Sequence, residues 1–197
     1  SIVTGVQTCA LPICLAFWQT DLQAQTWTNL GPKNEAGCMT RLSLHSASNR
    51  LFAASPDGGL WRSDISSSSP TWTPISDFLD NIEIRAFGVD PSNPDLIYAA
   101  NKRGSLYSTT TGGTTWTKLQ SFDKSFGHVN RILVNGLQVY LATTAGFFRS
   151  DNSGVTWVPL RASADVLEAV MDPDDSQHIY IGVRGDILIV GLLALLP

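Results

Sequence analysis

The dipeptide Thr-Trp recurs along the chain at nearly even spacing. It closes four polar stretches, which end at Trp27, Trp72, Trp116 and Trp157. The intervals between these tryptophans are 45, 44 and 41 residues. A fixed period of about 40–50 residues is the signature of a repeat architecture, in which each unit buries its apolar face only against its neighbours. This spacing constrains the fold more than any other feature of the chain.

Each interval contains short apolar segments that are separated by turn residues. In the second unit, these segments predict strands at 83–89, 96–101, 105–109 and 115–119. In the third unit, Asn135-Gly136 lies between two apolar runs, which is a strong hairpin signal. Four short antiparallel strands in each period of this length are typical of a propeller blade.

No segment shows the 3.6-residue period of an amphipathic helix. We therefore predict an all-β chain, a β-propeller fragment of about 3.5 four-stranded antiparallel blades within residues 25–185. The predicted blades lie at about 38–75, 81–119, 127–160 and 165–185. The segment that carries Trp27 is interpreted as the last strand of a further repeat, whose other strands are absent or supplied by ring closure.

The first 24 residues do not follow the repeat. Residues 3–13 (VTGVQTCALPI) resemble a translated sequencing adapter, so we interpret residues 1–13 as an artefact and exclude them from the fold. Residues 14–24 begin with an apolar run and end in Ala24, which resembles the remnant of a secretory signal peptide. This interpretation predicts a secreted or cell-envelope protein.

Residues 186–197 (DILIVGLLALLP) form an atypical apolar tail where a third strand and another Thr-Trp turn are expected. They are too few to span a bilayer, which takes about 20 residues. Two hypotheses stay open: a variant final strand, or a frame error in the sequence. We favour the frame error, because so apolar a run is unusual for an edge strand and promotes aggregation.

Composition argues against several kinds of site. The net charge is −4 and the 13 Lys and Arg residues are scattered, which argues against a nucleic-acid surface. The three Cys and three His residues lack the spacing of a zinc site, and we expect Cys38 to be a buried thiol. The acidic turns at 90–95 and 172–175 are interpreted as plain loops rather than calcium sites. We therefore expect no metal and no cofactor.

The turn that ends at Trp157 resembles a known repeat motif. The Asp-box, or BNR repeat, has the pattern Ser-x-Asp-x-Gly-x-Thr-Trp. Ser150, Gly154 and the Thr-Trp pair match this pattern, and Asn152 takes the place of the Asp. The resemblance covers roughly residues 26–185 and implies a propeller fold.

A second copy of the motif ends at Trp116. Gly113 and Trp116 match it, while Thr109 and Thr111 stand in for its Ser and Asp. The copy that ends at Trp72 is two residues too long and lacks the Gly. Short side-chain oxygens cap turn N–H groups, Gly permits positive φ, and Trp packs on the apolar layer of its blade. We therefore expect the motif to be structural rather than ligand-binding.

Propellers that carry this motif include sialidases, xyloglucan-degrading glycosidases, sortilin-type receptor ectodomains and photosystem assembly factors. The Arg-Ile-Pro motif of sialidases is missing, since residues 131–133 are Arg-Ile-Leu. In the xyloglucan-degrading enzymes, one of two catalytic Asp residues lies in a turn that resembles Thr-Asp-x-Gly-Gly. Residues 55–59 (SPDGG) are similar, but Pro56 holds the Asp position and Asp57 lies one place later.

Three arginines occupy matching places in the first predicted strands of successive blades. They are Arg41, Arg85 and Arg131, and the fourth blade has Glu168 at this place. Because the first strand of a blade lines the central channel, the three guanidinium groups are expected to converge there. They would favour a ligand that carries a carboxylate or sulfate. The alternative is that these side chains face a wet channel and only aid solubility.

The sequence thus favours a secreted or cell-envelope module, sortilin-like in style, that binds a protein, peptide or polysaccharide and is not catalytic. The alternative is part of a xyloglucanase-like propeller glycoside hydrolase, with its catalytic residues partly missing. Further blades of the same chain are expected partners, whereas nucleic acid and a membrane span are not. No nucleophile elbow or phosphate loop occurs, and no catalytic residue is predicted.

Overall fold

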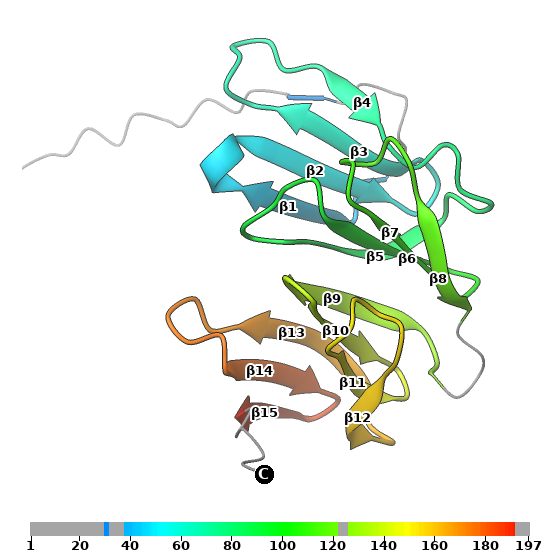
Figure 1. Cartoon of the computed structure of the whole chain (residues 1–197), viewed down its shortest axis with the longest axis vertical. Helices are drawn as coiled ribbons and strands as arrows, with labels where there is room; N and C mark the ends of the chain where they lie inside the picture. The colour runs from blue at the N-terminus through cyan, green and yellow to red at the C-terminus, as the bar shows by residue number, and fades with distance from the viewer. Residues whose placement is uncertain (1–29, 32–37, 122–125, 192–197) are drawn as a thin grey trace, which may run out of the picture.

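The computed structural model describes residues 30–31, 38–121 and 126–191. Within these ranges the chain consists of antiparallel sheets and one short 3-10 helix, η1 (Ser46–Ser48). Three sheets have four strands and one has three, which confirms the prediction of an all-β propeller with about three and a half blades (Figure 1). The predictions for residues 1–13 and 14–24 and for Trp27 lie outside the described residues.

Each blade follows the order of the chain, so that consecutive strands pair with each other. The first blade consists of β1 (Arg41–His45), β2 (Arg50–Ser55), β3 (Gly59–Asp64) and β4 (Trp72–Pro74). The second consists of β5 (Ile84–Val89), β6 (Ile97–Asn101), β7 (Ser105–Thr109) and β8 (Thr117–Ser121). The third consists of β9 (Val129–Asn135), β10 (Gln138–Thr143), β11 (Gly146–Ser150) and β12 (Val158–Ala162). The fourth consists of β13 (Val166–Met171), β14 (His178–Val183) and β15 (Asp186–Gly191).

Residues 186–191 form the third strand of the fourth blade, although the sequence analysis placed them in an atypical tail. β15 pairs with β14 along its whole length, so the blade extends to Gly191 instead of ending at residue 185. Ile187 and Ile189 are 77% and 65% exposed, whereas the alternate side chains pack against the third blade. The strand is therefore apolar on both faces, and the described structure buries one of them.

The hydrophobic core lies between the blades. Phe52, Tyr98 and Tyr140 occupy equivalent places in the second strands of the first three blades, and each belongs to the cluster at the junction with the following blade. All three are at most 1% exposed. Tyr180 holds the same place in β14 and is 39% exposed. Because strand side chains alternate between faces, each sheet contributes one face to each junction that it shares.

The turn at 109–116 is closed by its own side chains. Thr109 Oγ1 accepts the backbone N–H groups of Thr111 and Gly113, each at 3.1 Å. Thr111 Oγ1 accepts the N–H of Thr115 at 3.0 Å. These bonds keep the Thr-Trp pair in the turn, which is why β8 begins at residue 117 and not at the predicted residue 115.

The turn at 150–157 has the same pattern with different residues. Ser150 Oγ accepts the N–H groups of Asn152 and Gly154 at 3.3 and 2.8 Å. Asn152 Oδ1 accepts the N–H of Thr156 at 2.8 Å. β12 likewise begins two residues later than predicted. Asn152 here and Thr111 in the preceding blade stand at the Asp position of the motif. Each accepts the backbone N–H of the Thr before the Trp, which is the bond expected of the Asp.

In the described structure, Trp72, Trp116 and Trp157 each contact the chain that precedes their own blade. The indole Nε1 of Trp116 donates to the carbonyl of Ile75, directly after β4, at 2.6 Å. Trp72 donates in the same way to the carbonyl of Leu30, also at 2.6 Å. The ring of Trp116 packs at the junction of the first two blades, and that of Trp157 at the next junction. The sequence indicated a contact within one blade, whereas the structure shows a contact between blades.

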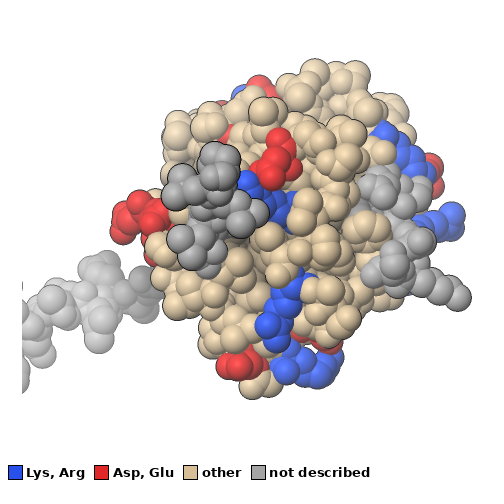
Figure 2. Space-filling model, turned by 60° about the horizontal axis from the view of Figure 1, so that its bottom comes forward, with Lys and Arg blue, Asp and Glu red and all other residues tan. Residues whose placement is uncertain are grey.

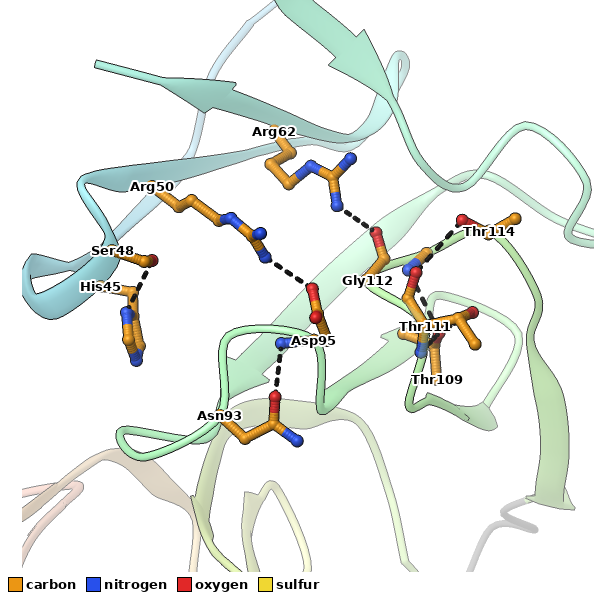
Figure 3. A network of polar contacts seen from close by, with 11 residues as sticks. His45, Ser48, Arg50, Arg62, Asn93, Asp95, Thr109, Thr111, Gly112 and Thr114 are labelled. Atoms are coloured by element: carbon orange, nitrogen blue, oxygen red, sulfur yellow. Dashed lines mark hydrogen bonds and ion pairs between the residues drawn. The ribbon is translucent and has the colours of Figure 1, made fainter. Parts of the chain in front are cut away.

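Polar contacts at the rim add to the junction of the first two blades (Figure 3). Arg50 Nη1 on β2 lies 2.5 Å from Asp95 Oδ1, in the turn before β6. Arg62 Nη1 on β3 donates to the carbonyl of Gly112 at 2.9 Å. The N–H of Gly112 donates to the carbonyl of Asp95 at 3.0 Å. Two arginines of the first blade therefore hold two adjoining turns of the second.

A buried carboxylate links the second and third blades beyond the end of β5. Asp90 is 1% exposed, and Gly136, in the hairpin of the third blade, donates its N–H to Asp90 Oδ2 at 2.6 Å. Burial is the largest single influence and raises the pKa of Asp90. The hydrogen bonds from Ser92, Gly136 and Asn93 together outweigh burial, so the pKa lies below its ordinary value.

Gly113 provides a test of how closely two blades approach. Its φ is +95°, and a Cβ there would lie 2.5 Å from the Cβ of Ile75. We expect Gly113→Ala to lower the free energy of unfolding by about 2–4 kcal/mol in urea denaturation, from backbone strain and overpacking together. Gly136→Ala is the matched control, since its φ is +60° and nothing lies within 4 Å. It should cost only about 1–2 kcal/mol, and equal losses would contradict the tight junction.

The Asp90 carboxylate predicts a loss of stability in acid. Because its folded pKa is lowered, its contribution is complete above the unfolded value of about 3.9 and is lost as the pH falls through the folded pKa. Urea denaturation should therefore show Asp90→Asn to be less stable than the wild type at neutral pH. The difference should shrink steadily below about pH 4. A difference that stays constant from neutral to acidic pH would disprove this role.

Candidate functional site

The first strands of the four blades lie next to one another at the centre of the arc that the blades form (Figure 1). Arg41, at the start of β1, reaches across the next two of these inner strands. Its Nε donates to the carbonyl of Arg85 on β5 at 3.3 Å, and its Nη2 donates to the carbonyl of Asn130 on β9 at 2.5 Å. One guanidinium group thus ties together the starts of three blades.

Glu168 on β13 captures two of the three predicted channel arginines. Its Oε2 lies 3.5 Å from Arg41 Nη1, and its Oε1 lies 3.2 Å from Arg131 Nε. The side chain of Arg85 makes no hydrogen bond or ion pair within the described residues. The structure therefore brings Arg41 and Arg131 together, but on a carboxylate of the chain itself, and Arg85 stands apart from them. Three guanidinium groups do not converge, because Glu168 takes the place of the expected anion.

A hollow of about 440 Å³ opens where the inner strands begin. Its lining includes Thr40, Pro56, Glu83, Arg85, Lys102 and Asn130. These residues come from the starts of β1, β5 and β9 and from the turns that follow β2 and β6. We name this feature the entrance hollow. Three blades build it, so its shape depends on how the blades are spaced.

The sequence analysis missed the ion pair in this hollow. Glu83 Oε1 and Lys102 Nζ are 3.1 Å apart, and Asn81 Nδ2 donates to Glu83 Oε2 at 3.2 Å. These bonds, that of Asn81 first and that of Lys102 second, lower the pKa of Glu83 and keep it ionised. The signal was present in the predicted hairpin, because the register that pairs Ile84 with Asn101 places Glu83 opposite Lys102.

The turn that resembles a glycosidase motif lies next to the entrance hollow. Ser55 Oγ accepts the N–H groups of Asp57 and Gly58 at 3.3 and 3.0 Å, and Trp61 Nε1 donates to the carbonyl of Gly58 at 2.6 Å. Pro56 lines the hollow, whereas the next residue, Asp57, is exposed and is not among the lining residues. Because the carboxylate lies one residue later than in the motif, a proline and not an aspartate lines the hollow at the motif position.

Other features of the surface are less suited to a polar ligand. A second hollow of about 250 Å³, farther along the inner strands, is mostly apolar; it is lined by Arg131 as well as by residues such as Phe87, Ile132 and Met171. On the face drawn in Figure 2, charged side chains form small separate groups within a mainly uncharged surface. Among the described residues, no three His, Cys, Asp or Glu side chains are grouped to hold a metal, and no helix could cross a membrane. Cys38 is exposed, contrary to the buried thiol that we expected.

Comparison with known proteins supports the glycosidase hypothesis more than the receptor-like one. No family model matches the sequence. The chain is similar to the xyloglucanase Xgh74A of Acetivibrio thermocellus, with 27% identity over 190 residues. This similarity covers 80% of the chain and 22% of the relative, so the chain spans less than a quarter of that protein.

Solved structures show the same fold. The crystal structure of a GH74 enzyme from Niastella koreensis matches with a TM-score of 0.64 and 22% identity, over 80% of this chain and 28% of that one. The structure of YCF48 bound to D1 peptide matches with a TM-score of 0.55 and 14% identity, over 79% of this chain and 65% of that one. At these identities the likeness establishes the β-propeller fold, and no further property follows from it.

Glu168→Gln tests the ionic bridge across the inner strands. The Glu168 side chain is 49% exposed, so solvent screens its pairs and the loss in unfolding free energy should be about 0.2–1 kcal/mol. Because salt screens exposed charges, the loss should shrink when urea denaturation is repeated at high salt. Asp77→Asn, at an exposed carboxylate without an ion pair in the described structure, is the control. The bridge would be refuted if both variants matched the wild type at low salt.

Proposed function

We propose that this chain forms an arc of a propeller glycoside hydrolase that acts on β-glucans of the xyloglucan type. The similarity to a xyloglucanase, which extends over 80% of the chain, carries the proposal. The entrance hollow supports it, since three blades there combine hydroxyl, amide and charged groups around a space of about 440 Å³. Ligand sites usually occupy concavities of roughly 300–1,000 Å³. Residues 14–24, which resemble the remnant of a secretory signal peptide, support export to where polysaccharides occur.

Near the hollow, the described residues offer one carboxylate that is free for the chemistry. Hydrolysis of a glycosidic bond ordinarily uses two carboxyl groups on opposite sides of the bond. Asp57 is the candidate for one of them, because it is exposed and directly follows Pro56, which lines the hollow. Glu83 is less suitable, since its two oxygens are engaged by Lys102 and Asn81. The partner carboxylate would come from outside the described residues.

A non-catalytic binding module is the second candidate function. The presence of Pro56 at the motif position of the Asp favours it, because proline has no group that can transfer a proton. The fold likeness to YCF48, solved with a bound peptide, is compatible with a binding role. In this case the entrance hollow would bind a glycan or peptide without cleaving it.

A reducing-sugar assay with the gene product on xyloglucan separates the two candidates. The proposal predicts hydrolysis, and Asp57→Asn should slow it by about 100-fold or more, the usual effect of removing a catalytic acid or base. Asp77→Asn, which changes an equivalent charge away from the hollow, should leave the rate unchanged. Binding of xyloglucan oligosaccharides without hydrolysis would favour the binding module. Full activity in Asp57→Asn would remove Asp57 from the mechanism.

A further inference from the structure

The charge of the entrance hollow has an imbalance that the proposed function does not use. Its lining contains three cations, Arg41, Arg85 and Lys102, and one carboxylate, Glu83. Lys102 pairs with Glu83, and Arg41 pairs with Glu168. Among the described residues, these two pairs leave Arg85 as the uncompensated charge of the lining. A hollow with one unpaired guanidinium group favours an anion.

The Arg85 side chain is available to a ligand in the hollow. It belongs to β5, between the inner strands of the first and third blades, and its carbonyl accepts the Nε–H of Arg41 at 3.3 Å. Its side chain is exposed and lines the hollow, with no polar partner among the described residues. Its backbone is therefore fixed while its guanidinium fork is free for a bidentate bond to a carboxylate.

The neighbouring polar groups suit the hydroxyl groups of a sugar. Asn130 donates its Nδ2–H to the carbonyl of Val166 at 2.8 Å, and its Oδ1 makes no bond within the described structure. Thr40 Oγ1 donates to the carbonyl of Ala54 at 3.4 Å, and its lone pairs can accept. Both oxygens can therefore take hydroxyl protons from a ligand in the hollow.

The described lining residues include no aromatic side chain. Ligand sites are usually lined by hydrophobic and aromatic side chains. A neutral sugar would therefore find little to stack on in this hollow, whereas a charged sugar would find Arg85.

We propose that the entrance hollow binds a uronic acid residue of a glycan, with the sugar carboxylate on Arg85 and its hydroxyls on Asn130 and Thr40. The choice of a glycan over another carboxylate rests on the proposed function. The acidic group itself is argued from the charges of the hollow alone. The chain would then select acidic or acid-substituted polysaccharides among the glycans that reach it.

Isothermal titration with two matched disaccharides tests this proposal. One ends in glucuronic acid, and the other has glucose at the same position. The wild type should bind the acidic disaccharide more tightly, and Arg85→Gln should weaken that binding by about tenfold while leaving the weak binding of the neutral one unchanged. Arg161→Gln removes an exposed arginine on β12, away from the hollow, and should bind as the wild type does. Higher salt should reduce only the preference for the acidic sugar.

The proposal fails if the two disaccharides bind equally, if neither binds, or if Arg85→Gln retains the preference for the acidic sugar. These outcomes can be distinguished from a failure of the proposed function. Hydrolysis of xyloglucan without any preference for glucuronic acid would refute the inference and leave the hydrolase intact. Binding of the acidic disaccharide through Arg85 without hydrolysis of any glucan would refute the hydrolase and leave the inference intact.

Discussion

The fold depends on the contact between the Thr-Trp turn of one blade and the end of the blade before it. The indole of Trp116 donates to the carbonyl of Ile75, and Gly113 lets the turn approach the same residue without a side chain in between. This contact fixes how far apart two sheets lie, because the apolar faces can pack only at that separation. The size of the entrance hollow depends on this spacing, because its lining residues belong to three different blades.

Much of the fold could be predicted because its determinants are local. Turn residues and alternating apolar residues marked nearly all the strands, and the Thr-Trp period marked the blades. The outer strands β8 and β12 were placed two residues too early, because side chains such as Thr111 hold the Thr-Trp pair in the turn. The destination of the Trp116 N–H could not be predicted, since its acceptor lies 41 residues away and any exposed carbonyl would have served.

The strand positions of the arginines could be predicted, but their partners could not. Sequence alignment of the blades put Arg41, Arg85 and Arg131 at matching places on the inner strands. It could not tell which of them would remain unpaired, because that depends on how far each side chain reaches across neighbouring strands. Arg41 crosses two strands to meet Glu168, and Arg131 meets the same carboxylate. The arginine without a side-chain partner in the described structure is therefore Arg85, on the middle of the three strands, which only the three-dimensional arrangement identifies.

The aromatic side chains of the second strands, Phe52, Tyr98 and Tyr140, bear on how blades can be added to such a protein. In the second blade, Tyr98 packs toward the following blade and Trp116 sends its indole N–H back to the preceding one, so the two faces of the blade are not alike. Repeats joined by such unlike faces stack head to tail in one direction only. A duplicated blade could pack on both of its neighbours through the existing contacts, whereas an inverted blade could pack on neither of them. Evolution or design can therefore lengthen the arc by whole periods without inventing a new interface.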